Sequence, residues 1–246
     1  MNTVAVNGQS SVTDVFRRLD KSLPGWRMRH SLKRLLGRLP NASVVSLVEG
    51  FTYLSRAKLQ ALESHARQIR RDGVAGAFVE CGVGAGGSAA VIGTWAKRAG
   101  RPLFLFDTFD GLPPPSEGDP DFSEAAKWTG QCRGSIEEIR ALLSELHCDL
   151  EATTFIQGLF QDTVPAWNGP IALLHLDGDW YESTSVCLGT LWDFVSPGGF
   201  VQLDDYGTWQ GCRRAVDEFV ERHGLMSDLN VVDQGVWLRK RIGISR

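Results

Sequence analysis

Cysteine is scarce in this chain, and its cysteines follow no recognisable pattern. The five cysteines among 246 residues are odd in number and show no C-x-x-C spacing. They are Cys81, Cys132, Cys148, Cys187 and Cys212. Zinc centres and disulfide frameworks need paired or repeated cysteines, so we expect neither, and a reducing cytoplasmic environment is the simplest account.

An excess of positive charge and long apolar runs are also missing. The chain has 26 Lys and Arg against 29 Asp and Glu, a formal net charge of −3, which argues against a dedicated nucleic-acid binder. No apolar run approaches the length that spans a membrane, so we expect no stable membrane insertion. The first eleven residues lack a basic segment followed by an apolar one, and no signal peptide is expected.

Basic residues do gather in one segment near the N-terminus. Residues 12–39 hold eight Lys and Arg together with an apolar stripe that includes Leu32, Leu35 and Leu36. We interpret residues 1–45 as a tail and basic helical extension, and residues 46–246 as one folded domain. The extension packs on the domain or on a partner subunit in one interpretation, and docks on an anionic membrane surface or acidic acceptor in the other.

Apolar runs alternate with amphipathic stretches from residue 77 onward. The runs indicate buried strands at 77–81, 102–106, 152–156, 171–176 and 200–203, and a hairpin at 231–238 brings the number of strands to seven. Helices are expected at 44–72 with a break near 50–52, and at 136–146, 183–194 and 212–223, while residues 196–199 read as a turn. Alternating strands and helices predict an α/β fold with a doubly wound, mostly parallel seven-stranded sheet.

A glycine-rich turn follows the first expected strand, in the stretch AFVECGVGAGGS at residues 77–88. Gly82, Gly84 and Gly87 match G-x-G-x-x-G, whose backbone N–H groups approach a nucleotide closely, and Ser88 is the expected N-cap of the next helix. Glu80 stands before the glycines, where a nicotinamide-binding strand is usually apolar. The resulting E-x-G-x-G pattern resembles the first motif of methyltransferases that use S-adenosylmethionine (SAM).

A carboxylate that could bind a ribose ends the second expected strand. Asp107 lies about 25 residues beyond Gly82, close to the spacing expected of an acid that accepts both ribose hydroxyls. A helix-capping role is the alternative for this residue. The irregular stretch after it, residues 108–130, has the composition of a lid or recognition loop, in which Trp128 either anchors a substrate or packs.

Acidic residues also follow the fourth and fifth expected strands, as Asp177-Gly178-Asp179 and Asp204-Asp205. Because ligands bind beyond the carboxyl ends of strands in doubly wound sheets, these four carboxylates should meet in one cleft if the two strands are neighbours. Such a set repels strongly unless a cation or protons neutralise it, and all-oxygen ligands favour Mg²⁺ or Ca²⁺ over zinc. The alternative is a set of separate capping and turn residues.

Several segments in order resemble the macrocin O-methyltransferase family (the TylF, MycF and NovP relatives). They are FTYLSRAKLQAL, VECGVGAGGSA, FDTFDGLP, LHLDGDWYEST and SPGGFVQLDDYGTWQGCRRAVDEF, within residues 50–240. The resemblance implies a class I, Rossmann-like SAM-dependent methyltransferase fold with a final antiparallel strand, and a homodimer or larger assembly. Residues 1–45 are not covered, and Gly84-Ala85 departs from the bulkier residues expected there.

Carried over by position, the resemblance implies roles for individual residues. Asp177, Asp204 and Asp205 would bind Mg²⁺, and Asp179, with Asp177 beside it, would be catalytic as the general base. The SAM site would include Glu80, Gly82, Gly84 and Ser88 at the methionine end, Thr52 at its carboxylate, Asp107 at the ribose, and Ser135 with Gln157-Gly158 at the adenine. His175 reads instead as a hydrogen-bonded core histidine.

The function expected from all this is Mg²⁺-dependent methyl transfer from SAM to a hydroxyl of a sugar on a natural product or glycoconjugate. The ion would lower the pKa of the hydroxyl and Asp179 would take its proton. A metal-dependent catechol or phenol methyltransferase, a nicotinamide-dependent oxidoreductase and a non-catalytic SAM-binding protein are the alternatives. The sequence does not identify the acceptor.

Overall fold

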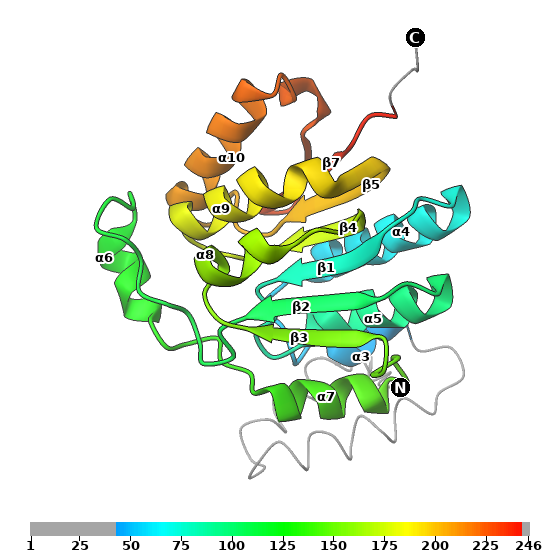
Figure 1. The fold of residues 1–246 in the computed structure, drawn as a ribbon. Helices are drawn as coiled ribbons and strands as arrows, with labels where there is room; N and C mark the ends of the chain where they lie inside the picture. Colours follow the sequence, from blue (N-terminus) through cyan, green and yellow to red (C-terminus); the bar gives the residue numbers. More distant parts are fainter. Residues whose placement is uncertain (1–42, 243–246) are drawn as a thin grey trace, which may run out of the picture. The chain divides into compact units, whose positions relative to one another are not determined.

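The computed structural model describes residues 43–242, which form a seven-stranded sheet between two layers of helices (Figure 1). The strands run in the order β3-β2-β1-β4-β5-β7-β6, with β7 antiparallel to both β5 and β6 and the other pairs parallel. Their bounds are β1 Ala77–Cys81, β2 Leu103–Asp107, β3 Thr153–Gln157, β4 Ile171–Leu176, β5 Val195–Leu203, β6 Asn230–Val232 and β7 Gly235–Arg239. The predicted doubly wound, mostly parallel sheet is therefore confirmed. The extension expected over residues 1–45 lies almost wholly outside the described residues.

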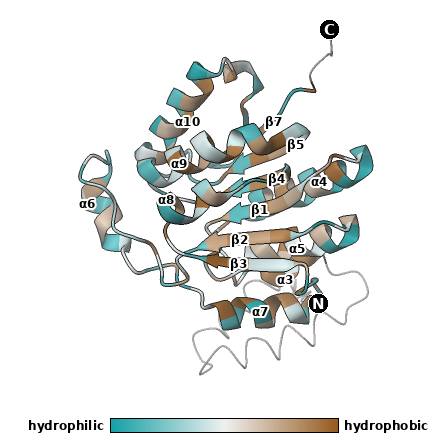
Figure 2. Ribbon diagram, viewed as in Figure 1, coloured by the Kyte–Doolittle hydropathy of each residue, from teal (hydrophilic) through white to brown (hydrophobic). Residues whose placement is uncertain are grey.

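The two central strands are buried along their whole length. Every residue of β1 and β4 is buried, and both strands are apolar apart from Glu80 and His175. Parallel strands that are covered on both faces need such continuous apolar runs, which appear as brown arrows in Figure 2. Because burial requires this continuous apolar character, the bounds predicted for both strands from the sequence are correct.

One layer of helices consists of α3 (Val44–Val48), α4 (Arg56–Asp72), α5 (Gly87–Ala99) and α7 (Ile136–Glu145). The other consists of α8 (Phe160–Thr163), α9 (Tyr181–Leu191) and α10 (Gln210–Arg222). The short helix α6 (Phe122–Ala125) and 3₁₀ turns at Ala126–Trp128, Val164–Ala166, Trp192–Phe194 and Met226–Asp228 complete the described elements. Each layer packs its apolar side on one face of the sheet (Figure 1). Within residues 43–242, no helix has the length and apolar character needed to cross a membrane.

Two local expectations were wrong. Ser88 is not the N-cap of α5, because the helix begins at Gly87 after Gly86, whose φ of 90° closes the turn. Strand β5 begins at Val195 instead of residue 200, so the expected turn at 196–199 belongs to the strand. Gly198 and Gly199 exchange backbone hydrogen bonds with Lys240, and this antiparallel partner extends the strand through the glycines.

Candidate active site

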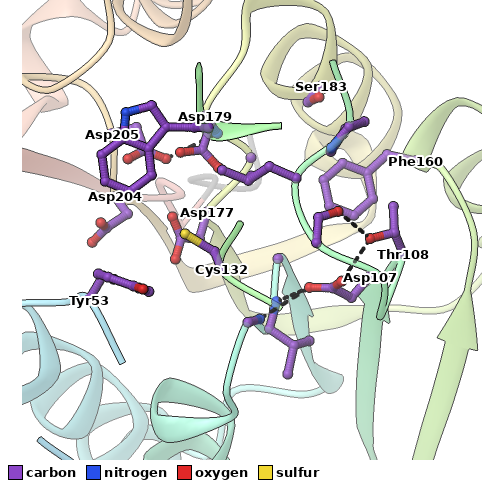
Figure 3. Close-up of a pocket in the computed structure, with 18 of the residues that line it drawn as sticks. Tyr53, Asp107, Thr108, Cys132, Phe160, Asp177, Asp179, Ser183, Asp204 and Asp205 are labelled. Atoms are coloured by element: carbon purple, nitrogen blue, oxygen red, sulfur yellow. Dashed lines mark hydrogen bonds between the residues drawn. The ribbon is translucent and has the colours of Figure 1, made fainter. Parts of the chain in front are cut away.

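A cavity of about 240 Å³ opens where β1, β2, β4 and β5 end (Figure 3). Its wall includes the glycine-rich turn after β1, Asp107 at the end of β2, and the aspartates that follow β4 and β5. The loop after β2 contributes Trp128 and Cys132, and the segment between α3 and α4 contributes Thr52 and Tyr53. The site thus lies beyond the carboxyl ends of the parallel strands, as predicted for this kind of sheet.

Two of the three motif glycines are required by the protein's own backbone. Gly82 has a φ of 91°, and a Cβ atom there would lie 1.8 Å from the carbonyl oxygen of Asp177. A Cβ on Gly87 would lie 2.7 Å from the carbonyl oxygen of Phe51, which accepts a hydrogen bond from the Gly87 N–H. Gly84 differs, since its nearest neighbour would be 3.5 Å away and its φ is 50°. Gly84 is thus the one motif glycine at which a Cβ atom would meet its neighbours at ordinary van der Waals distance.

The carboxylate of Asp107 is held against the glycine-rich turn. Its Oδ2 accepts hydrogen bonds from the N–H groups of Val83 at 2.6 Å and Gly84 at 3.2 Å. Its Oδ1 accepts one from the Phe109 N–H at 2.7 Å. Asp107 lines the cavity and also fixes the shape of the turn (Figure 3). Three backbone N–H groups thus fix the orientation of the carboxylate that a bound ribose would meet.

Glu80 lies beneath the turn and does not reach the cavity wall. Glu80 and His175 are both fully buried on adjacent strands, and Glu80 Oε1 lies 2.9 Å from His175 Nδ1. The expectation that His175 is a hydrogen-bonded core residue is confirmed. Glu80 Oε2 has no hydrogen-bond partner among the described residues. Any contact of Glu80 with a SAM molecule therefore stays a prediction.

The other residues expected at the SAM site divide into two groups. Thr52, Gly82, Gly84, Ser88 and Gly158 line the cavity with Asp107, whereas Ser135 and Gln157 do not. Ser135 caps α7, where its hydroxyl accepts a hydrogen bond from the Glu138 N–H and its own N–H donates to the Glu138 carboxylate. The Gln157 amide donates to the Thr108 carbonyl oxygen. Their predicted adenine contacts gain no support from this geometry.

Three aspartates from two neighbouring strands converge on one side of the cavity. Asp177, Asp179 and Asp205 each offer a carboxylate oxygen within 4.8 Å of the others (Figure 3). Asp179 has a φ of 57°, and its N–H donates to Asp205 Oδ2 at 3.1 Å, which bends the chain after β4 toward β5. The prediction that acids from these two strand ends meet in one cleft is confirmed, since Asp204 also lines the cavity, and these three form the tightest group.

This arrangement is costly for three negative charges. Burial raises the pKa values of Asp177 and Asp179 well above their usual range, and the charges of neighbouring aspartates raise them further. Burial, followed by the charge of Asp204, raises the pKa of Asp205 to about 6. A bound cation relieves both effects, and an all-oxygen donor set suits a hard divalent ion such as Mg²⁺.

Asp204 is placed differently from the ligand set that the sequence predicted. Its Oδ2 lies 2.9 Å from the ammonium of Lys58, which also donates to the Asp204 carbonyl oxygen at 3.0 Å. Both side chains are buried, and Asp204 Oδ1 has no hydrogen-bond partner among the described residues. Sequence reasoning missed Lys58. The available signal was a lysine beside the apolar stripe of α4, next to Leu59.

Comparison with known proteins gives the family. The macrocin O-methyltransferase (TylF) family matches residues 45–240. The chain belongs to this family. It is 31% identical over 203 residues to the 8-demethyl-8-(2,3-dimethoxy-alpha-L-rhamnosyl)-tetracenomycin-C 4'-O-methyltransferase of Streptomyces olivaceus, covering 79% of this chain and 77% of that protein. It is 32% identical over 202 residues to the demethyldecarbamoylnovobiocin O-methyltransferase of Streptomyces niveus, covering 77% and 76%.

A solved structure agrees with this assignment. The O-methyltransferase NovP superposes with a TM-score of 0.70 at 29% identity, covering 78% of this chain and 82% of that chain. This macrocin O-methyltransferase family member is therefore an enzyme with the class I methyltransferase fold, and its family uses SAM. That assignment removes the nicotinamide-dependent oxidoreductase and the non-catalytic SAM-binding protein from the alternatives.

In this family member, a tryptophan holds the catalytic aspartate candidate and two further aspartates hold the loop after β2. Trp209 Nε1 donates to Asp179 Oδ1 at 3.1 Å. Asp119, which is buried, accepts a hydrogen bond from the Tyr181 N–H at 2.9 Å, and Asp121 accepts one from the Gln210 N–H. The loop after β2 is thereby attached to the first residues of α9 and α10. Asp119 had no recognisable sequence signal, because its role depends on where the loop docks.

Proposed function

We propose that this chain transfers the methyl group of SAM to a hydroxyl of a sugar carried on a natural product or glycoconjugate, with Mg²⁺ at the aspartate cluster. One observation carries the proposal: the glycine-rich turn with Asp107, and the cluster with Asp179, line the same cavity. A donor on the first side and an acceptor on the second would face each other, as in-line displacement requires. The named relatives support a sugar acceptor, since one acts on a rhamnosyl group and another is a mycinamicin III 3''-O-methyltransferase.

The residues present fit both the donor and the ion. Gly84 and Asp107 would receive the nucleoside part of SAM, and Thr52 with Ser88 would lie at its methionine end. Asp177 and Asp205 belong both to the ligand set implied by resemblance and to the set that meets in space, so we assign the ion to them. When bound, Mg²⁺ would lower the pKa of the acceptor hydroxyl and orient it.

The chemical step needs a base, and Asp179 is placed to be one. The acceptor oxygen attacks the methyl carbon, the bond from that carbon to sulfur breaks, and the hydroxyl proton passes to the Asp179 carboxylate. The products are a methyl ether, S-adenosylhomocysteine (SAH) and protonated Asp179. The Trp209 N–H donates to Asp179 Oδ1 and so fixes the orientation of this carboxylate.

The test combines binding with turnover. In Asp179→Asn we expect SAH affinity to be retained and turnover to fall by about 10²–10⁴-fold, the usual contribution of a general base. Asp193→Asn, at an exposed aspartate of the 3₁₀ turn after α9 that does not line the cavity, is the matched control and should keep wild-type turnover. EDTA should abolish transfer and added Mg²⁺ restore it. Undiminished turnover in Asp179→Asn, or in EDTA, would remove that residue or the ion from the proposal.

A catechol or other phenol is the second candidate acceptor, because Trp128 and Trp209 line the cavity and suit an aromatic ring. A panel of rhamnosides, other glycosides and catechols separates the two, since only the preferred class should be methylated efficiently. The proposal also includes a homo-oligomeric cytoplasmic enzyme, with residues 46–246 as its catalytic domain and residues 1–45 as an extension.

A further inference from the structure

Exposed apolar side chains gather at the mouth of the cavity. Tyr53 is 77% exposed, Leu159 is 40% exposed and Trp128 is 37% exposed, and all three line it. They come from three separate segments, before α4, after β3 and after β2. Large apolar side chains exposed together around one opening indicate a surface for an apolar ligand. None of the catalytic roles given above requires them.

One of these side chains, Trp128, is connected to the catalytic aspartate through Trp209. Trp209 donates to Asp179 Oδ1, and its ring centre lies 6.5 Å from that of Trp128 at an interplanar angle of 81°. Trp128 is therefore one ring further from Asp179 than Trp209 is. A sugar whose hydroxyl reaches Asp179 would lie beside Trp209, and whatever is attached to that sugar would extend toward Trp128.

The aromatic side chains are also held in place before any ligand arrives. Trp180 packs against Trp209 at 5.1 Å, and its Nε1 donates to the Pro113 carbonyl oxygen at 2.9 Å. The contacts of Asp119 and Asp121 with α9 and α10 fix the middle of the loop that carries Trp128. A surface that is already ordered loses little conformational freedom when a flat ligand binds to it.

Building on the proposed function, we infer that Trp128, Leu159 and Tyr53 form a subsite for a flat, apolar aglycone attached to the acceptor sugar. The sugar occupies the space between Asp179 and Trp209, and an aromatic aglycone packs on the exposed ring of Trp128. Aromatic pairs of this kind add affinity beyond the area that they bury. The enzyme then selects glycosides over free sugars at a position that does not touch the reacting hydroxyl.

The experiment compares two acceptor analogues by calorimetry with SAH and Mg²⁺ present. The probes are methyl α-L-rhamnopyranoside and p-nitrophenyl α-L-rhamnopyranoside, which share a sugar and differ in the aglycone. We expect the aryl glycoside to bind about tenfold more tightly, a difference of about 1.4 kcal/mol. Trp128→Ala should remove most of that preference, and Trp128→Phe should retain part of it.

The control is Phe122→Ala, an equally exposed aromatic residue of the same loop that does not line the cavity, and it should keep the full preference. SAH affinity, measured in each variant, shows that the site is folded. Equal affinity for the two glycosides, or a preference that survives in Trp128→Ala, would overturn the subsite alone. Failure of both glycosides to bind while SAH binds would overturn the sugar acceptor, and the subsite with it.

Discussion

Replacing Lys58 with methionine leaves the carboxylate of Asp204 buried without its cation. The two side chains are only 7% and 9% exposed, and the ammonium donates to both the carboxylate and the backbone carbonyl of Asp204. Methionine keeps the length and the apolar stem of lysine, so packing changes little while the charge is lost. Breaking a buried pair by removing one partner costs about 3–5 kcal/mol, because the remaining charge stays in a poorly solvated place.

The assay is urea unfolding in EDTA, which keeps divalent ions from substituting for the ammonium. The matched control is Arg67→Met on the exposed side of the same helix, where Arg67 is 66% exposed and pairs with Glu63 at 3.4 Å. That pair should contribute less than about 1 kcal/mol. The double variant Lys58→Met with Asp204→Asn should recover most of the lost stability, because it removes the uncompensated charge.

The result that refutes this reasoning is a Lys58→Met variant no less stable than Arg67→Met. Such a result would mean that solvent or rearranged side chains stabilise the Asp204 carboxylate, so that its burial does not determine the free energy of unfolding. A destabilised Lys58→Met whose stability is not recovered by Asp204→Asn would place the cost in packing rather than in charge.

Three further predictions concern pH, the glycine-rich turn and the loop after β2. Burial lowers the pKa of His65 from about 6.5 to about 4, so its contribution to stability is complete above pH 6.5 and is lost as the pH falls toward 4. The loss in the free energy of unfolding should reach about 3 kcal/mol, at about 1.4 kcal/mol per pH unit. Unfolding curves of His65→Phe should show a smaller loss over the same pH range. Gly82→Ala should melt at a lower temperature than the wild type, because its methyl carbon would lie 1.8 Å from the Asp177 carbonyl oxygen. An unchanged melting temperature would contradict this close approach. Asp119→Ala should release the loop from the Tyr181 N–H. Limited proteolysis would detect this as faster cleavage within residues 113–128, and cleavage at the wild-type rate would contradict it.

The sheet and the meeting of the aspartates could be predicted because both follow from strand order. Buried parallel strands appear in sequence as apolar runs, and the carboxyl ends of neighbouring parallel strands lie at one edge of the sheet. Asp177 and Asp205 follow β4 and β5, which pair in register from Leu173–Phe200 to Leu176–Leu203. Topology alone therefore brings their side chains together.

The ion pair of Asp204 could not be predicted, because it depends on side-chain direction across 146 residues of sequence. Asp204 and Asp205 are consecutive residues directly after β5, and only the packing of α4 decides which of them meets a lysine. The capping role of Ser135 was missed for a different reason. The sequence SIEE at 135–138 is a capping-box pattern, and recognising it would have assigned that hydroxyl to the helix end.

The carboxylates around the cavity differ most in what already neutralises them. Asp107 accepts hydrogen bonds from three backbone N–H groups, and the charge of Asp204 is paired with the ammonium of Lys58, although Asp204 Oδ1 has no partner among the described residues. Among the described residues, no lysine or arginine pairs with Asp177, Asp179 or Asp205. Asp205 is buried and Asp177 and Asp179 are partly buried, and clustered negative charge of this kind needs protons or a metal ion. We therefore expect that a divalent ion would add most stability at these three residues. The ammonium of Lys58 donates both of its hydrogen bonds to Asp204, and although its charge lowers the pKa of Asp205, burial and the charge of Asp204 outweigh it.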